Sequence, residues 1–224
     1  MIMERNAMVA ERIDMLIAHF DKYLAAFDKY RPFSRLGQYE NHRHTIDRRI
    51  ELGSAEKALQ DEYFLKSLYA TLKSWGIGQR GSRLLSYDSF VTELRHHTCD
   101  IVSLDHLRID DERIDIPDLT LRIERLVGSI SIVDNANKLV SCTKALHHIL
   151  PDVVVPMDRQ YTQHFFGWHN PEFQYDPNSC FRVAFHAFAR IAKAVVLDHY
   201  VGQGWHTSPT KVLDNAGVGY CLSH

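Results

Sequence analysis

Apolar residues at helical spacing dominate this chain. Over residues 5–29 they recur every three or four positions and predict an amphipathic helix; they are Met8, Val9, Ile13, Leu16, Ile17, Phe20, Leu24 and Phe27. The same spacing, bounded by capping residues, Pro or Gly, predicts more helices. These span 55–75, 86–97, 117–127, 138–150 and 179–200, followed by a short helix from Ser208 and a tail unwound by Gly217 and Gly219. The pattern predicts an all-α, multi-helix protein.

Residues 138–166 combine two helices with an apolar segment between them. Pro151 ends the first helix, and the valines at 153–155 are predicted to cross the interior. Pro156 is predicted to open the second helix, because its fixed φ suits a first helical turn. Asp158 then lies in that turn, where the helix dipole keeps a carboxylate ionised. Asp158 is therefore either a helix cap or a catalytic acid.

Composition narrows the class of protein. With 224 residues and 45% hydrophobic content, the chain can bury a substantial core. We expect one unit with two lobes, about 30–116 and 117–166, against which 1–29 and 167–224 pack. No apolar run approaches the roughly 20 residues of a membrane span, and no signal peptide opens the chain. The prediction is a cytoplasmic, monomeric protein without membrane contact.

The titratable residues and cysteines do not indicate a metal site, and the overall charge does not indicate a nucleic-acid-binding protein. The formal net charge is −2, so binding to nucleic acid requires a local basic patch. The four cysteines lie far apart and suggest neither zinc nor disulfides. Fourteen histidines include the close pairs His42/His44 and His147/His148, but none has the spacing of a known metal motif. We predict no metal and no cofactor.

Two segments have an open interpretation. The basic stretch from Arg31 to Arg49 is either a solvated helix face or an edge that contacts phosphate. The loop at 76–83 is either a helix–helix linker or an anion-binding loop, because glycines let backbone N–H groups approach a phosphate closely. Its candidate DNA contacts are Gln79, Arg80, Ser82 and Arg83.

The order of elements before Asp158 resembles that of the helix-hairpin-helix DNA glycosylases, including the endonuclease III and 8-oxoguanine glycosylase branches. This order is a helix, a short turn, a helix that begins at a lysine, an apolar run and then the aspartate. About fifty residues (117–166) carry the resemblance. It implies a two-lobed helical fold in which the hairpin holds a DNA phosphate, a lysine opens the second hairpin helix and an essential aspartate follows. By position these are Lys138 and Asp158, twenty residues apart, with Lys144 as a second candidate lysine.

The resemblance implies a function in base excision, whether in DNA repair or in defence against phage DNA. Asp158 would stabilise an oxocarbenium-like state during hydrolysis of the base–sugar bond, and Lys138 could add lyase activity. The implied DNA contacts also include Asn135, Asn137, Ser141, Lys144 and Arg159. The flipped base would stack on aromatic side chains; the candidates are Trp75, Tyr161, Phe165, Trp168 and Trp205. The hairpin departs from the family pattern, since Asn135 and Asn137 replace its glycines.

Two other functions stay open. Arg159 and His164 form an R-x-x-x-x-H motif that resembles the active site of small α-helical HEPN ribonucleases, in which such a pair performs acid–base work. The altered hairpin is also compatible with a nucleic-acid-binding module that lacks catalysis.

Overall fold

The computed structural model describes residues 2–79, 83–135 and 138–224, and over these ranges it contains thirteen α-helices, one 3-10 helix and no β-strand. The all-α prediction is confirmed. The first helices are α1 (Ile2–Ala18), α2 (Phe20–Tyr30), α3 (Gln38–Leu52), α4 (Ala55–Gln60), α5 (Glu62–Ser74), α6 (Tyr87–His96) and α7 (Thr98–Val102). The others are α8 (Ile116–Ser129), α9 (Leu139–Ile149), α10 (Tyr161–Phe165), α11 (Asn170–Tyr175), α12 (Pro177–Ala194), η1 (Leu197–His199) and α13 (Pro209–Ser223).

Three helices predicted as continuous are interrupted. The helix expected over 179–200 ends as α12 at Ala194, where Val195 is extended (φ −129°, ψ 138°), and η1 follows. The helix expected over 5–29 divides at His19 into α1 and α2. The helix expected over 55–75 divides at Asp61, whose backbone is extended (φ −81°, ψ 117°). The Asp61 carboxylate accepts the N–H of Phe64 at 2.7 Å and pairs with Arg48 at 2.6 Å. A side chain that satisfies a free N–H at a helix start stabilises the break.

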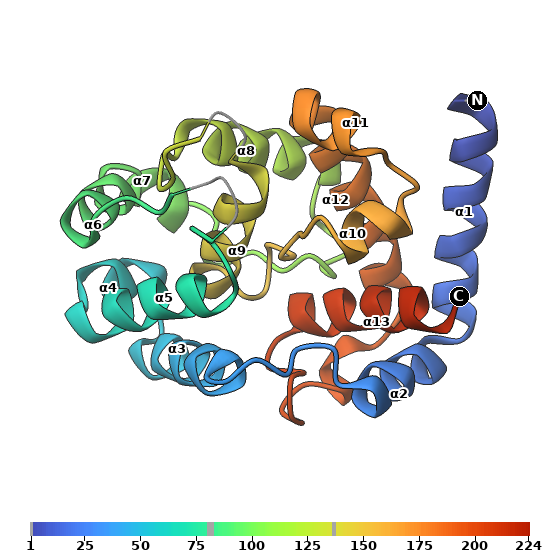
Figure 1. Ribbon diagram of the computed structural model, residues 1–224, viewed down its shortest axis with the longest axis horizontal. Coiled ribbons are helices and arrows are strands. Elements are labelled where there is room, and N and C mark those ends of the chain that lie inside the picture. The colour runs from blue at the N-terminus through green and yellow to red at the C-terminus, as the bar shows by residue number, and fades with distance from the viewer. Residues whose placement is uncertain (1, 80–82, 136–137) are drawn as a thin grey trace.

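The C-terminal helix α13 packs along α2, as the red and blue ribbons in Figure 1 show. Gly217 and Gly219 lie inside this helix, so the prediction that they unwind the tail is wrong. A Cβ on Gly219 would lie 1.8 Å from the carbonyl oxygen of Tyr23 in α2. Glycine at 219 therefore lets the two helix backbones approach each other, which local sequence patterns do not reveal.

The connections around α9 position the site. An isolated antiparallel bridge between Leu84 and Val133 places the end of the loop at 76–83 beside the segment that connects α8 to α9. Arg83 and Asp134 form an ion pair there, at 2.5 Å. After α9 the chain stays non-helical up to α10, so the prediction that Pro156 opens a helix is wrong.

The apolar faces of these helices meet in one cluster that includes residues from α1 to α13. Helix α9 lies in the middle of the molecule (Figure 1), and nine of its eleven residues are buried. No helix in the described ranges is long and apolar enough to cross a bilayer. The division into two lobes stays a prediction.

Candidate active-site pocket

A pocket of about 450 Å³ opens where five segments of the chain meet. Its lining residues fall within 32–38, 75–77, 135–144, 156–161 and 211–214. Four cationic side chains and two carboxylates are among them: Arg35, Lys144, Arg159 and Lys211, with Asp158 and Asp214. The pocket therefore combines a surplus of positive charge with a pair of acids.

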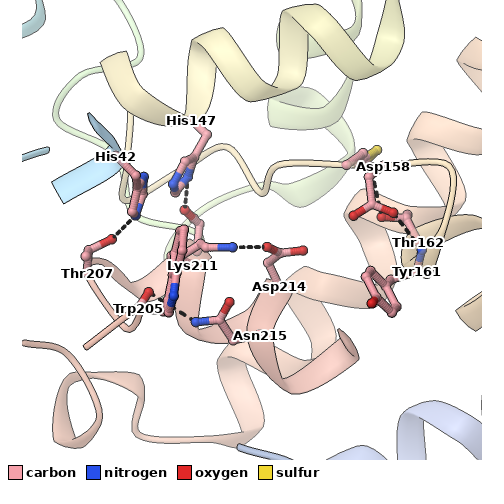
Figure 2. Close-up of polar contacts among 12 residues, drawn as sticks. His42, His147, Asp158, Tyr161, Thr162, Trp205, Thr207, Lys211, Asp214 and Asn215 are labelled. Carbon is pink, nitrogen blue, oxygen red and sulfur yellow. Dashed lines mark hydrogen bonds and ion pairs between the residues drawn. The ribbon is translucent and has the colours of Figure 1, made fainter. Parts of the chain in front are cut away.

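Asp158 lines this pocket and is fixed by its neighbours on α10. Its Oδ1 accepts the backbone N–H of Tyr161 at 2.6 Å, and its own backbone N–H donates to Thr162 Oγ1 at 3.0 Å (Figure 2). The two interpretations of Asp158 thus describe one residue: the carboxylate anchors the start of α10 and also faces the pocket. A half-buried, oriented carboxylate can stabilise positive charge on a bound substrate.

Lys144, and not Lys138, shares the pocket with Asp158. The ammonium group of Lys144 lies 5.5 Å from the centre of the Trp75 ring, a cation–π distance. Burial lowers the pKa of Lys144, although the charges of Asp158 and Asp214 act in the opposite direction. Lys138 instead donates to Ser131 Oγ at 2.5 Å, next to the start of α9. Sequence position alone favoured Lys138.

Lys211 and Asp214 from α13 complete the pocket, and the sequence did not single them out. Lys211 Nζ pairs with Asp214 Oδ2 at 2.5 Å, and the two side chains are only 1% and 9% exposed (Figure 2). Burial raises the pKa of Asp214, while the Lys211 ammonium opposes this rise. The i,i+3 spacing of the two residues within the helix predicted from Ser208 was the available signal.

Two of the five aromatic candidates line the pocket. Trp75 and Tyr161 do so, and Phe33 joins them. Phe165 and Trp168 lie in the core, where each packs against Phe166. Trp205 is half-buried and packs edge-on against Phe33 at a centroid distance of 5.4 Å, so it supports an aromatic wall from behind.

Some of the candidate DNA contacts line the pocket, and others lie outside it. Asn135, Ser141 and Arg159 line the pocket. Gln79 lies outside it, where its side chain accepts a hydrogen bond from Arg35 and donates to the carbonyl of Lys73, and Arg83 pairs with Asp134. Arg80, Ser82 and Asn137 lie outside the described residues.

Most arginines of the basic stretch are engaged within the protein. Arg49 is buried, pairs with Asp105 and donates to the carbonyl of Ile149 at 2.7 Å. Arg48 pairs with Asp61, and Arg43 pairs with Asp47. Arg35 is the member of this stretch that reaches the pocket.

The R-x-x-x-x-H pair does not gather at the pocket. Arg159 lines it, whereas His164 is an exposed residue of α10 that is absent from the lining. The backbone carbonyl of His164 accepts from Arg12 at 2.7 Å.

Comparisons of this chain with protein-family models, with curated proteins and with solved structures found no match. The site's own chemistry therefore carries the functional argument.

Proposed function

We propose that this protein is a DNA glycosylase-like enzyme that hydrolyses the N-glycosidic bond of a damaged or modified base flipped out of duplex DNA. The observation that carries the proposal is that Asp158 and Lys144 share one aromatic-walled pocket. Its volume of about 450 Å³ falls in the range of small-molecule sites. Trp75 and Tyr161 supply ring faces on which a base can stack.

The surplus of cationic lining residues favours a polyanionic substrate. Arg35 and Arg159 are exposed, so they are available to the phosphates that flank an extruded nucleotide. Lys211 is held deep in the pocket by Asp214, where this pair offers both a donor and an acceptor to a base edge. Arg35 and Arg159 would thus bind phosphate, and the Lys211–Asp214 pair would recognise the base.

Asp158 is the group proposed to act on the reacting sugar. Departure of the base leaves an oxocarbenium-like sugar, which a fixed carboxylate stabilises. The hydrogen bond from the Tyr161 N–H orients this carboxylate before substrate binds. Water attacking C1′ then gives an abasic site and the free base.

Lys144 is the proposed nucleophile if the enzyme also has lyase activity. Its lowered pKa increases the fraction of neutral amine, which is the nucleophilic form. Attack by Nζ at C1′ displaces the base, and loss of a proton from nitrogen with opening of the sugar ring gives a Schiff base. Lys138 donates to Ser131 outside the pocket lining, which favours Lys144 for this step.

The test is a panel of duplexes, each carrying one modified base, assayed for abasic sites by alkaline cleavage. Asp158→Asn removes the charge but keeps an oxygen that can accept the Tyr161 N–H, so the fold around α10 is preserved. We expect base release to fall by at least about 100-fold, a typical loss for a catalytic group of this kind. If no duplex loses a base, or if Asp158→Asn keeps full activity, the proposal fails.

Borohydride trapping tests the lysine. Lys144→Gln is expected to abolish any covalent adduct with DNA, and the matched variant Lys138→Gln is expected to keep it. The reverse result would return the nucleophile to Lys138. His164→Ala is the control for RNA cleavage, which should be absent from both the native protein and the variant.

A further inference from the structure

Three buried histidines face one another beneath the pocket. His42 comes from α3, and His147 and His148 come from α9; all three are 0% exposed. One ring nitrogen from each lies within 4.8 Å of the other two. The three residues do not line the pocket described above.

The outward nitrogen of every ring already has an oxygen partner. His148 Nδ1 lies 2.7 Å from the Lys144 carbonyl. His147 Nδ1 lies 3.1 Å from the Val154 carbonyl and 3.0 Å from the Thr210 hydroxyl, which itself donates to the Pro151 carbonyl. A carbonyl only accepts, so both Nδ1 atoms carry the proton and both Nε2 atoms present a lone pair. The His42 Nε2 lies 2.7 Å from the hydroxyl of Thr207, which can accept or donate (Figure 2).

The inward nitrogens are less well satisfied. His147 Nε2 is buried and has no hydrogen-bond partner among the described residues. His148 Nε2 lies 2.9 Å from His42 Nδ1, so in this arrangement His42 donates to His148. A buried lone pair without a donor is destabilising, and here it points into a group of imidazoles. Hydrogen bonding within the protein therefore leaves the cluster incomplete.

We propose that His42 Nδ1, His147 Nε2 and His148 Nε2 bind a divalent transition-metal ion of the zinc class. Neutral imidazole nitrogens are common ligands of Zn²⁺ and of other divalent transition-metal ions that are intermediate between hard and soft. Metal-bound histidines almost always donate the other ring N–H to an oxygen, and the Lys144 carbonyl, the Val154 carbonyl and Thr207 supply those oxygens.

Binding requires the three rings to adjust, because the candidate ligand nitrogens lie within 4.8 Å of one another and His147 Nε2 has no hydrogen-bond partner among the described residues. Metal–nitrogen bonds of about 2.0–2.1 Å place neighbouring ligand nitrogens roughly 3.3 Å apart in a tetrahedral site. The 2.9 Å contact between His42 and His148 must therefore open by a few tenths of an ångström. The proton on His42 moves from Nδ1 to Nε2, and the Thr207 hydroxyl oxygen then accepts a hydrogen bond from the Nε2–H group. No net proton has to leave the protein.

The surroundings both oppose and support an ion here. The Lys211 charge is close enough to lower the pKa of all three histidines, although burial is the larger cause. This charge disfavours a cation, but Asp214 partly offsets it.

A bound ion would join α3 to α9 behind the pocket wall. The rings of Trp75 and Trp205 pack against His42 at centroid distances of 5.2 and 5.3 Å. The ion would thus rigidify the support of Trp75, which lines the pocket. Because the site is buried, the ion would have a structural role and would help to position this pocket wall.

The test begins with the native protein stripped of metal by a chelator and titrated with Zn²⁺ and with Co²⁺. We expect one ion per chain, a higher melting temperature on loading, and an X-ray absorption spectrum of the Co²⁺ form with imidazole ligands. Failure to bind a stoichiometric ion, or a ligand shell without imidazole, would overturn the proposal. These readouts on native protein need no variant to fold.

Variants then locate the ion. His147→Asn should abolish stoichiometric binding, while the matched control His186→Asn, an exposed histidine on α12, should leave binding unchanged. Thr207→Val keeps the shape but removes the oxygen facing His42, and it should weaken Zn²⁺ binding about 10–100-fold. Equal binding by His147→Asn and the native protein would show that the ion is held elsewhere, and would refute this site.

Discussion

Two glycines in α13 make the packing of α13 on α2 testable. Gly217 and Gly219 lie two residues apart in the same buried helix, yet their surroundings differ. A Cβ at 217 would be 4.0 Å from the nearest atom, in the Phe188 ring, which is ordinary contact. A Cβ at 219 would be 1.8 Å from the Tyr23 oxygen and 2.7 Å from the Tyr23 carbonyl carbon.

Alanine is therefore expected to have opposite effects at these positions. At 217 it removes the excess flexibility of glycine from a helix, which stabilises the fold by about 0.5–1 kcal/mol. At 219 the new methyl group would meet backbone atoms of α2, so the helices must separate by about an ångström. Such overpacking costs about 1–3 kcal/mol or more, which outweighs the gain in helix propensity.

Thermal unfolding followed by circular dichroism measures both effects. For a chain of this size 1 kcal/mol shifts the melting temperature by about 2–4 °C. We expect Gly217→Ala to raise it by up to about 4 °C and Gly219→Ala to lower it by at least about 2 °C. Equal shifts in the same direction would refute the close approach of α13 to Tyr23.

Two further predictions concern ion pairs. Arg49→Ala should lower the free energy of unfolding by about 3–5 kcal/mol, because it leaves Asp105 without its buried partner. The exposed pair of Arg43 and Asp47 is the control: Arg43→Ala should lower the free energy of unfolding by less than about 1 kcal/mol. Urea unfolding measures both. Asp61 has a lowered pKa, mainly through its hydrogen bond with Arg48, so it stabilises the fold above its ordinary pKa of 3.8 and loses this effect as the pH falls below it. The difference in unfolding free energy between the native protein and Asp61→Asn should shrink over that range, and a constant difference would contradict the pairing.

Local sequence signals predicted much of the secondary structure. Apolar spacing and capping residues found α6, α8 and α9 within a few residues of their ends, because these features act within one or two turns of chain. The start of α12 was also found, but this helix ends at Ala194, well before the predicted end at residue 200. The breaks at His19 and Asp61 were missed because the apolar pattern continues across them. At Asp61 the break depends on Arg48, which belongs to another helix.

The candidate site was predicted in part. The sequence placed Asp158 near the start of a helix, and the structure places it against α10 and in the pocket. The choice between Lys138 and Lys144 depends on which direction a helical side chain faces in the folded protein. Lys211 and Asp214 are more than fifty residues from Asp158 in the sequence, and no local pattern connects them.

The amino-acid sequence by itself determined the helical class and the location of most helices, since periodic burial and capping are local properties. Only the tertiary structure decided which side chains meet. Packing of α13 on α2, allowed by Gly219, carries Lys211 and Asp214 to Asp158, and packing of α3 on α9 brings His42 to His147 and His148. Both depend on contacts between distant segments, which are selected by the burial of apolar surface across the whole chain.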